Sequence, residues 1–85
     1  MKVYIESENR TVIGSPVEII EDLRKKAFDP KDSLEEYLDW LQDHLRRFFK
    51  PDADFGTGSI EDRSLAAIKI LASMESLQIE EEQTL

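Results

Sequence analysis

The N-terminal part of the chain alternates between short apolar and polar runs. The runs VYI and TVI are rich in β-branched and aromatic residues, and the polar segment ESENR separates them. This pattern predicts a β-hairpin from Lys2 to Gly14 that turns near Glu8 and Asn9. Because a lone two-stranded hairpin is marginally stable in water, we expect a helix to cover one of its faces or another chain to extend its edge.

The next segment, GSPVEIIEDLRKKAF, has the pattern of an amphipathic helix. Ser15 is suited to the N-cap, Pro16 to the first helical position and Glu18 to the reciprocal hydrogen bond of a capping box. The pattern predicts a helix from about Pro16 to Ala27. Its apolar residues fall on one face, namely Ile19, Ile20, Leu23 and Ala27.

A second helix is predicted over SLEEYLDWLQDHLRRFFK, with Ser33 as its N-cap. One half of this helix is apolar, and Trp40 and His44 lie at the margin of that half. So broad an apolar face predicts packing against more than one element. The apolar half contains Leu34, Tyr37, Leu38, Leu41, Leu45, Phe48 and Phe49.

A third helix is predicted from Ile60 to about Leu77, after the loop KPDADFGTGS and the N-cap Ser59. One apolar stripe contains Ile60, Ala67, Ile70, Leu71, Met74 and Leu77, and a second, on the far side, contains Leu65, Ile68 and Ala72. A helix with two apolar faces in so small a chain must be covered on both sides, most simply by a second copy. The sequence therefore predicts a homodimer interface at the second stripe.

These elements predict an α+β fold that is mostly α, with an N-terminal β-hairpin followed by three α-helices. We expect a single domain over residues 1–78. The last residues, IEEEQTL, predict a frayed, disordered acidic tail over residues 79–85.

Composition narrows the expected partners and location. The chain has 85 residues, no cysteine and a formal net charge of -8, which repels phosphate backbones and argues against direct nucleic-acid binding. No apolar run approaches the roughly 20 residues that span a bilayer, so no membrane contact is expected. Because cysteine is absent and the N-terminus lacks the apolar core of a signal peptide, the sequence predicts a cytoplasmic location.

The candidate residues for chemistry are few. His44 is the chain's one histidine, and Asp43 points about 100° away from it on the helix, whereas Trp40 is placed to stack on its ring. The sequence contains no pair of nucleophile and base, no zinc ligand set and no cofactor motif. It therefore predicts a protein that is not an enzyme and has no cofactor or metal.

The loop before the third helix contains two further candidate binding sites, one for calcium and one for an anion. Asp52 and Asp54 are spaced like the first two ligands of a calcium loop, but Gly56 and Arg63 stand where oxygen ligands belong. The GTGS segment could bind an anion at a helix N-terminus, but no strand precedes it, no lysine follows it, and acids surround it. An acidic loop that ends in a serine cap is the stronger interpretation.

The runs GSPVEIIEDLRKKAF and SLEEYLDWL, joined by an Asp-Pro linker and preceded by a short hairpin, resemble small uncharacterised proteins of bacteria and their phages or mobile elements. Those proteins are similar in placing a G-S/T-P-x-E-I start on the first helix and an SLEEY-like start on the second. The resemblance covers about the first fifty residues and implies no known activity.

Two hypotheses follow for function. The first is a non-catalytic interaction or regulatory protein that acts through protein–protein contacts as a homodimer. The alternative is a phage-type nucleic-acid mimic that inhibits a DNA- or RNA-binding enzyme. For the alternative, the expected acidic partner surface consists of Glu35, Glu36, Asp39 and Asp43.

Overall fold

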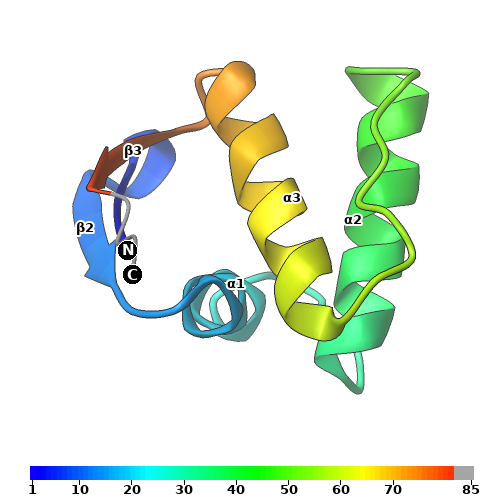
Figure 1. The fold of residues 1–85 in the computed structure, drawn as a ribbon, viewed down its shortest axis with the longest axis horizontal. Helices are drawn as coiled ribbons and strands as arrows, with labels where there is room; N and C mark the ends of the chain where they lie inside the picture. The colour runs from blue at the N-terminus through cyan, green and yellow to red at the C-terminus, as the bar shows by residue number, and fades with distance from the viewer. Residues whose placement is uncertain (82–85) are drawn as a thin grey trace.

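The structure, a computed structural model, describes residues 1–81 and shows a small α+β fold (Figure 1). The predicted α+β class and the N-terminal hairpin followed by helices are confirmed, although "mostly α" understates a sheet that has a third strand. The elements in chain order are β1 (Lys2–Ile5), the 3-10 helix η1 (Glu6–Glu8), β2 (Arg10–Ile13), α1 (Pro16–Lys25), α2 (Leu34–Phe48), α3 (Ile60–Ser73) and β3 (Leu77–Glu81).

The C-terminal part of the chain corrects two predictions. The third helix ends at Ser73 rather than near Leu77, and the chain turns at Glu75, which has a left-handed φ of 62°. The expected tail is wrong for residues 79–81, since Leu77–Glu81 form β3, and the boundary predicted after residue 78 falls inside this strand. Residues 82–85 of the expected tail lie outside the described residues.

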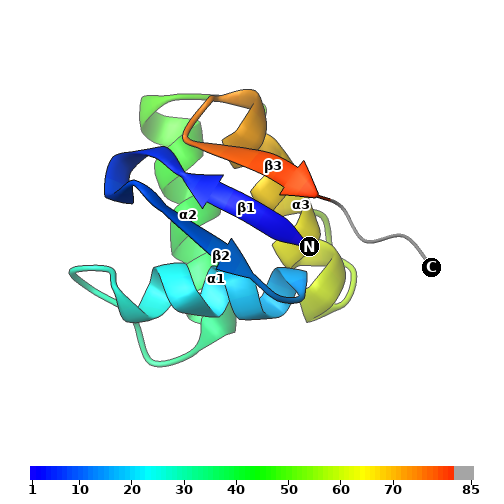
Figure 2. The same cartoon turned by 90° about the vertical axis from the view of Figure 1, so that its left-hand side faces the viewer.

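The physical reason for β3 is its alternating side chains. Leu77 and Ile79 face the helices, whereas Gln78 and Glu80 are exposed. Such alternation of every second residue is typical of a strand with one buried face. β3 pairs antiparallel with β1, so the strand order is β2-β1-β3 and β1 is central (Figure 2). Glu80, one of the acids that suggested a tail, is therefore an exposed residue of a sheet strand.

The helices lie on one side of the sheet. α1 and α3 pack against the sheet, and α2 packs on the side of α3 away from it (Figures 1 and 2). An ion pair between Arg10 and Asp22 adds a polar link between β2 and α1. The buried core cluster contains Val3, Ile19, Ile20, Tyr37, Leu38, Leu41, Leu45, Ala53, Phe55, Ala67, Ile68 and Leu77.

The three predicted serine caps are confirmed. The Ser15 hydroxyl accepts a hydrogen bond from the Glu18 N–H at 3.2 Å, and the Ser15 N–H donates to Glu18 Oε1 at 3.1 Å, which completes the capping box. The bond from the Ser15 backbone N–H lowers the pKa of the Glu18 carboxyl, and a hydrogen bond with the Ser15 side chain lowers it further. Ser33 and Ser59 accept equivalent bonds at α2 and α3, so local chemistry fixes where each helix begins.

The loop between α2 and α3 is part of the core. Ala53 and Phe55 are buried, and the Phe55 N–H donates to Gln42 Oε1 at 2.7 Å. The sequence pattern identified this segment as a loop from its acids, proline and glycines but gave no sign of its two buried residues. Their packing joins the C-terminal end of α2 to the start of α3.

We expect Phe55→Ala to lower the free energy of unfolding by about 3–5 kcal/mol, because it removes a buried ring and leaves a cavity. Phe28 is fully exposed, so Phe28→Ala is the matched control and should change stability by less than about 0.5 kcal/mol. Urea denaturation followed by circular dichroism measures both. Equal effects would show that Phe55 does not pack as described.

Ser64 on α3 is fully buried, and its hydroxyl has no hydrogen-bond partner within the described part of the chain. Ser64→Ala should therefore raise the free energy of unfolding by about 1 kcal/mol, because it removes an unsatisfied polar group and improves helix propensity. Ser73→Ala is the control, since its hydroxyl is exposed and donates to the Ile70 carbonyl. A loss of stability in Ser64→Ala would reveal a hydrogen bond at this hydroxyl.

Candidate interaction surface

α2 carries a continuous row of rings, the aromatic ladder, formed by Tyr37, Trp40, His44, Phe48 and Phe49. The Tyr37 and Trp40 centroids are 5.7 Å apart, and Trp40 stacks on His44 at 5.0 Å with an interplanar angle of 20°. His44 then contacts Phe48 at 5.0 Å and Phe49 at 5.8 Å in tilted geometry. Spacings of three and four residues place Tyr37, Trp40, His44 and Phe48 one above another on the helix, and Phe49 directly follows its last residue.

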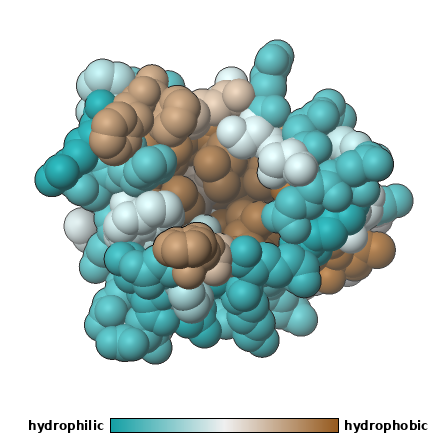
Figure 3. Space-filling model, turned by 180° about the vertical axis from the view of Figure 1, so that it is seen from behind, coloured by the Kyte–Doolittle hydropathy of each residue, from teal (hydrophilic) through white to brown (hydrophobic). Residues whose placement is uncertain are grey.

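The ladder becomes more exposed toward the C-terminal end of α2. Tyr37 is buried, whereas Trp40 is 38% exposed, Phe48 68% and Phe49 63%. Seen from behind, apolar side chains gather over this end of α2, at the upper left of Figure 3. Large aromatic groups that stay in contact with water are typical of surfaces that bind another protein.

The side chain of His44 packs among aromatic rings. The predicted stacking of Trp40 on His44 is confirmed, and the neighbouring Asp43 pairs with Arg47 at 3.0 Å instead of with the imidazole. Lys31 lies 5.7 Å from the centre of the Trp40 ring. Ring contacts and a cation over a ring hold the ladder in place, and they do not activate a nucleophile.

The predicted acidic surface lies on the exposed side of α2. Glu35, Glu36, Asp39 and Asp43 are all exposed. Asp39 forms an ion pair with Arg63, and Asp43 forms one with Arg47. Two of the four carboxylates are therefore neutralised by basic neighbours, and the surface is less negative than its sequence indicates.

The residues predicted to form a dimer interface do not lie together on an open surface. Ile68 is fully buried in the core, Ala72 is partly buried against that core, and Leu65 is half-buried. The sheet and α1 cover one side of α3 and α2 covers another, so elements of the same chain account for its second apolar stripe. Ile68 is not accessible to a second copy in this fold.

The acids of the loop after α2 bind neighbouring groups of the protein. Asp52 pairs with Lys50 at 3.6 Å, and Asp54 Oδ1 accepts a hydrogen bond from the Gly56 N–H at 2.7 Å. Within residues 1–81, no three or more side chains of metal-binding type lie close enough to share an ion. No helix among the described residues has the length and apolar character needed to cross a bilayer.

The sequence pattern placed Phe48 and Phe49 on the packed half of α2, and the structure leaves both largely exposed. The following loop packs along another flank of α2, where the Phe55 N–H donates to Gln42, the Ala53 carbonyl accepts from Arg46, and both loop residues are buried in the core. The signal for a ladder was present in the spacing of Trp40, His44 and Phe48. Periodicity alone could not show which of these rings stays in water.

Comparisons with protein-family models, with curated proteins and with solved structures found no significant match to this chain.

Burial at the inner end of the ladder raises the pKa of Tyr37, and the charge of Glu8 raises it further. Tyr37 thus keeps its proton in the folded state at a pH where an unfolded tyrosine, with a pKa of about 10, ionises. The stability linked to this proton is present below about pH 10 and is lost as the pH rises through the raised pKa.

We therefore expect the free energy of unfolding to fall less steeply above about pH 10 in Tyr37→Phe than in the unchanged protein. Urea denaturation across this pH range measures the slope. Identical slopes would mean that the Tyr37 hydroxyl is hydrated in the folded state.

Proposed function

We propose that this chain is a cytoplasmic, non-catalytic interaction or regulatory protein that acts through protein–protein contacts as a homodimer, with the aromatic ladder of α2 as the dimer surface. The exposure of Trp40, Phe48 and Phe49 along one helix is the observation that supports it. These rings form one connected surface, and burying it against a second apolar surface is favourable. This surface replaces the second stripe of α3 as the proposed interface.

The distribution of charge along α2 favours a second copy as the partner. Glu35 and Glu36 lie in the first turn, and Arg46 and Arg47 lie in the last. If two α2 helices pack antiparallel, the acidic end of each lies beside the basic end of the other. Such an arrangement is self-complementary, as a two-fold interface requires.

Glu36 and Arg47 are the pair best placed for this contact. Together with Trp40 and Asp43 they follow a spacing of four, three and four residues, so both charges lie on the same flank of the ladder. About a two-fold axis midway between them, Glu36 of one chain lies opposite Arg47 of the other. The existing pair of Arg47 with Asp43 is exposed and weak, so Arg47 can change partner at little cost.

Sedimentation equilibrium at increasing concentration tests the homodimer, and a strict monomer at high micromolar concentration would contradict it. Glu36→Arg and Arg47→Glu should each weaken self-association about fivefold to tenfold, because each places like charges together. The double variant, with both charges exchanged, should restore it. Glu61→Arg on α3 makes the same charge change away from the ladder and should leave the dimer intact.

The alternative proposal, a mimic of nucleic acid, is supported by the exposed carboxylates of α2 and the net charge of -8. The ion pairs of Asp39 and Asp43 weaken this support, because a basic groove would have to compete with Arg63 and Arg47 for those carboxylates. The exposed rings of the ladder also have no counterpart in a phosphate backbone. The homodimer is therefore the proposal that the geometry favours.

A further inference from the structure

His44 lies in the middle of the aromatic ladder. Its ring stacks on Trp40 at 5.0 Å and contacts Phe48 at 5.0 Å and Phe49 at 5.8 Å. The side chain is half-buried, so part of the ring stays in contact with water. The same ring therefore belongs to the surface that the proposed dimer buries.

Imidazole is the side chain whose charge changes between about pH 5 and pH 8. The chain contains one histidine, and it is this residue of the ladder. A proton on the ring turns a neutral aromatic surface into one with a cation at its centre, and both ring nitrogens then carry N–H donors. The character of the ladder therefore depends on the protonation state of His44.

The carboxylates of α2 that are close to His44 in sequence are held by arginines. Asp43 pairs with Arg47 at 3.0 Å. Asp39 pairs with Arg63 of α3. Asp43 is also the residue next to His44, so it points about 100° away from the imidazole on the helix. A charged His44 therefore relies on the neighbouring rings and on water rather than on either carboxylate.

Other elements bring charges of both signs to the ladder. Lys31, in the loop before α2, lies 5.7 Å from the centre of the Trp40 ring. Glu8 of η1 acts through its charge on Tyr37, at the buried end of the ladder. Ion pairs occupy further charged groups of the elements beside α2, namely Arg24 with Glu21 on α1 and Lys50 with Asp52 in the following loop. Lys31 thus opposes a second cation on the same stack of rings.

The proposed two-fold axis places both copies of His44 close to the centre of the dimer. The axis lies midway between Glu36 and Arg47, so it crosses α2 between Trp40 and His44. With a rise of about 1.5 Å per residue, the two His44 rings lie about 7.5 Å apart along the helices, one on each side of the axis. Each ring is covered by ladder rings of the other copy. Formation of the dimer thus takes water away from both imidazoles at once.

We infer that His44 makes self-association depend on pH, and that the dimer weakens when both rings are protonated. The inference rests on the proposed homodimer and adds its regulation. Two imidazolium ions near one axis repel each other, and each loses hydration that the covering rings of the other copy do not fully replace. The stack with Trp40 also favours a cation, but it is present in the monomer as well and so does not favour the dimer.

The direction of the effect follows from proton linkage. A dimer that disfavours charged His44 binds fewer protons than two monomers do. Lowering the pH therefore shifts the equilibrium toward the monomer, and raising the pH strengthens the dimer. Because each dimer contains two copies of the histidine, the effect is steeper than that of a single titrating group.

Sedimentation equilibrium of the full chain across this pH range, at constant ionic strength, measures the dissociation constant of the dimer. The constant should rise at least about tenfold between about pH 7.5 and about pH 5.5. Circular dichroism of the same samples checks that the chain stays folded at each pH.

A matched pair of variants assigns the effect to the imidazole. His44→Phe keeps an aromatic ring in the ladder and removes the titration, so its dissociation constant should change less than about twofold over the same range. Glu61→Gln on α3 removes a titratable group away from the ladder and should keep the full pH dependence. The comparison uses the pH dependence of each variant, so a change in the affinity of His44→Phe itself does not affect it.

NMR of the His44 ring protons gives a second readout. Their titration should move to lower pH when the protein concentration is raised from mostly monomer to mostly dimer, because the coupling between protonation and association is reciprocal. A histidine that only packs within the monomer would titrate identically at both concentrations.

A dimer whose dissociation constant is the same at both ends of the pH range, or lower at the acidic end, would overturn the inference. A pH dependence that survives in His44→Phe would also overturn it. Each of these results leaves the homodimer standing. A monomer at every pH contradicts the homodimer itself, and the regulation with it.

Discussion

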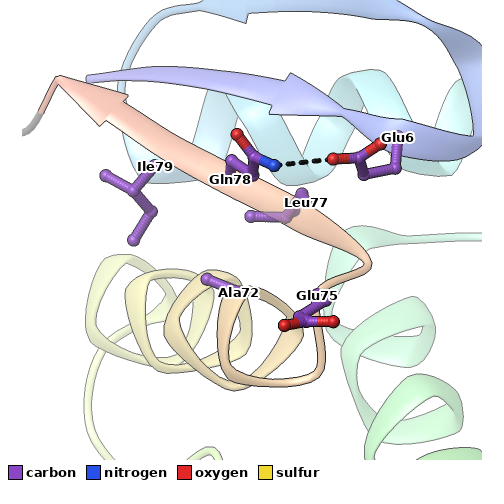
Figure 4. Close-up of a pocket in the computed structure, with 6 residues that line it drawn as sticks. All are labelled: Glu6, Ala72, Glu75, Leu77, Gln78 and Ile79. Carbon is purple, nitrogen blue, oxygen red and sulfur yellow. Dashed lines mark hydrogen bonds between the residues drawn. The ribbon is translucent and has the colours of Figure 1, made fainter.

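The pairing of β1 with two strands far apart in the sequence is the constraint on which the rest of the structure depends. β2 pairs with one side of β1 directly after a short 3-10 turn, and β3 pairs with the other side after all three described helices. For β3 to reach β1, α3 must run back toward the sheet and lie between it and α2. α3 ends just before the turn at Glu75 and β3 begins just after it, so the two elements lie side by side. A groove whose lining includes Ala72, Glu75 and Ile79 lies between them (Figure 4).

Sequence reasoning succeeded where the determining interactions are local. Ser15, Ser33 and Ser59 fix the helix starts through hydrogen bonds that span three residues, and the hairpin follows from two short runs and the turn between them. It failed for β3 because a five-residue strand with two apolar side chains becomes stable only when β1 is present as a neighbour. The glutamates after Ile79 resemble a tail until that pairing is known.

For the candidate surfaces too, features set by local spacing were predictable and features set by distant elements were not. Stacking of Trp40 on His44 was predictable from a spacing of four residues on one helix. The exposure of Phe48 and the burial of Ile68 were not, because each depends on which element covers that helix, and periodicity does not identify the cover. The hydrogen bond between Gln78 and Glu6 could not be predicted either, since these residues are distant in sequence and meet only through the pairing of β1 with β3.

The order of the strands also sets when the protein can fold during synthesis. β1 precedes the helices and β3 follows α3, so the sheet stays two-stranded during synthesis until α3 has been made. During that time the edge of β1 that later pairs with β3 is open. The strand carries the apolar Val3 and Ile5, which are buried in the complete fold. Contacts between residues so far apart slow folding, and the nascent sheet is most exposed to misassociation just before β3 emerges.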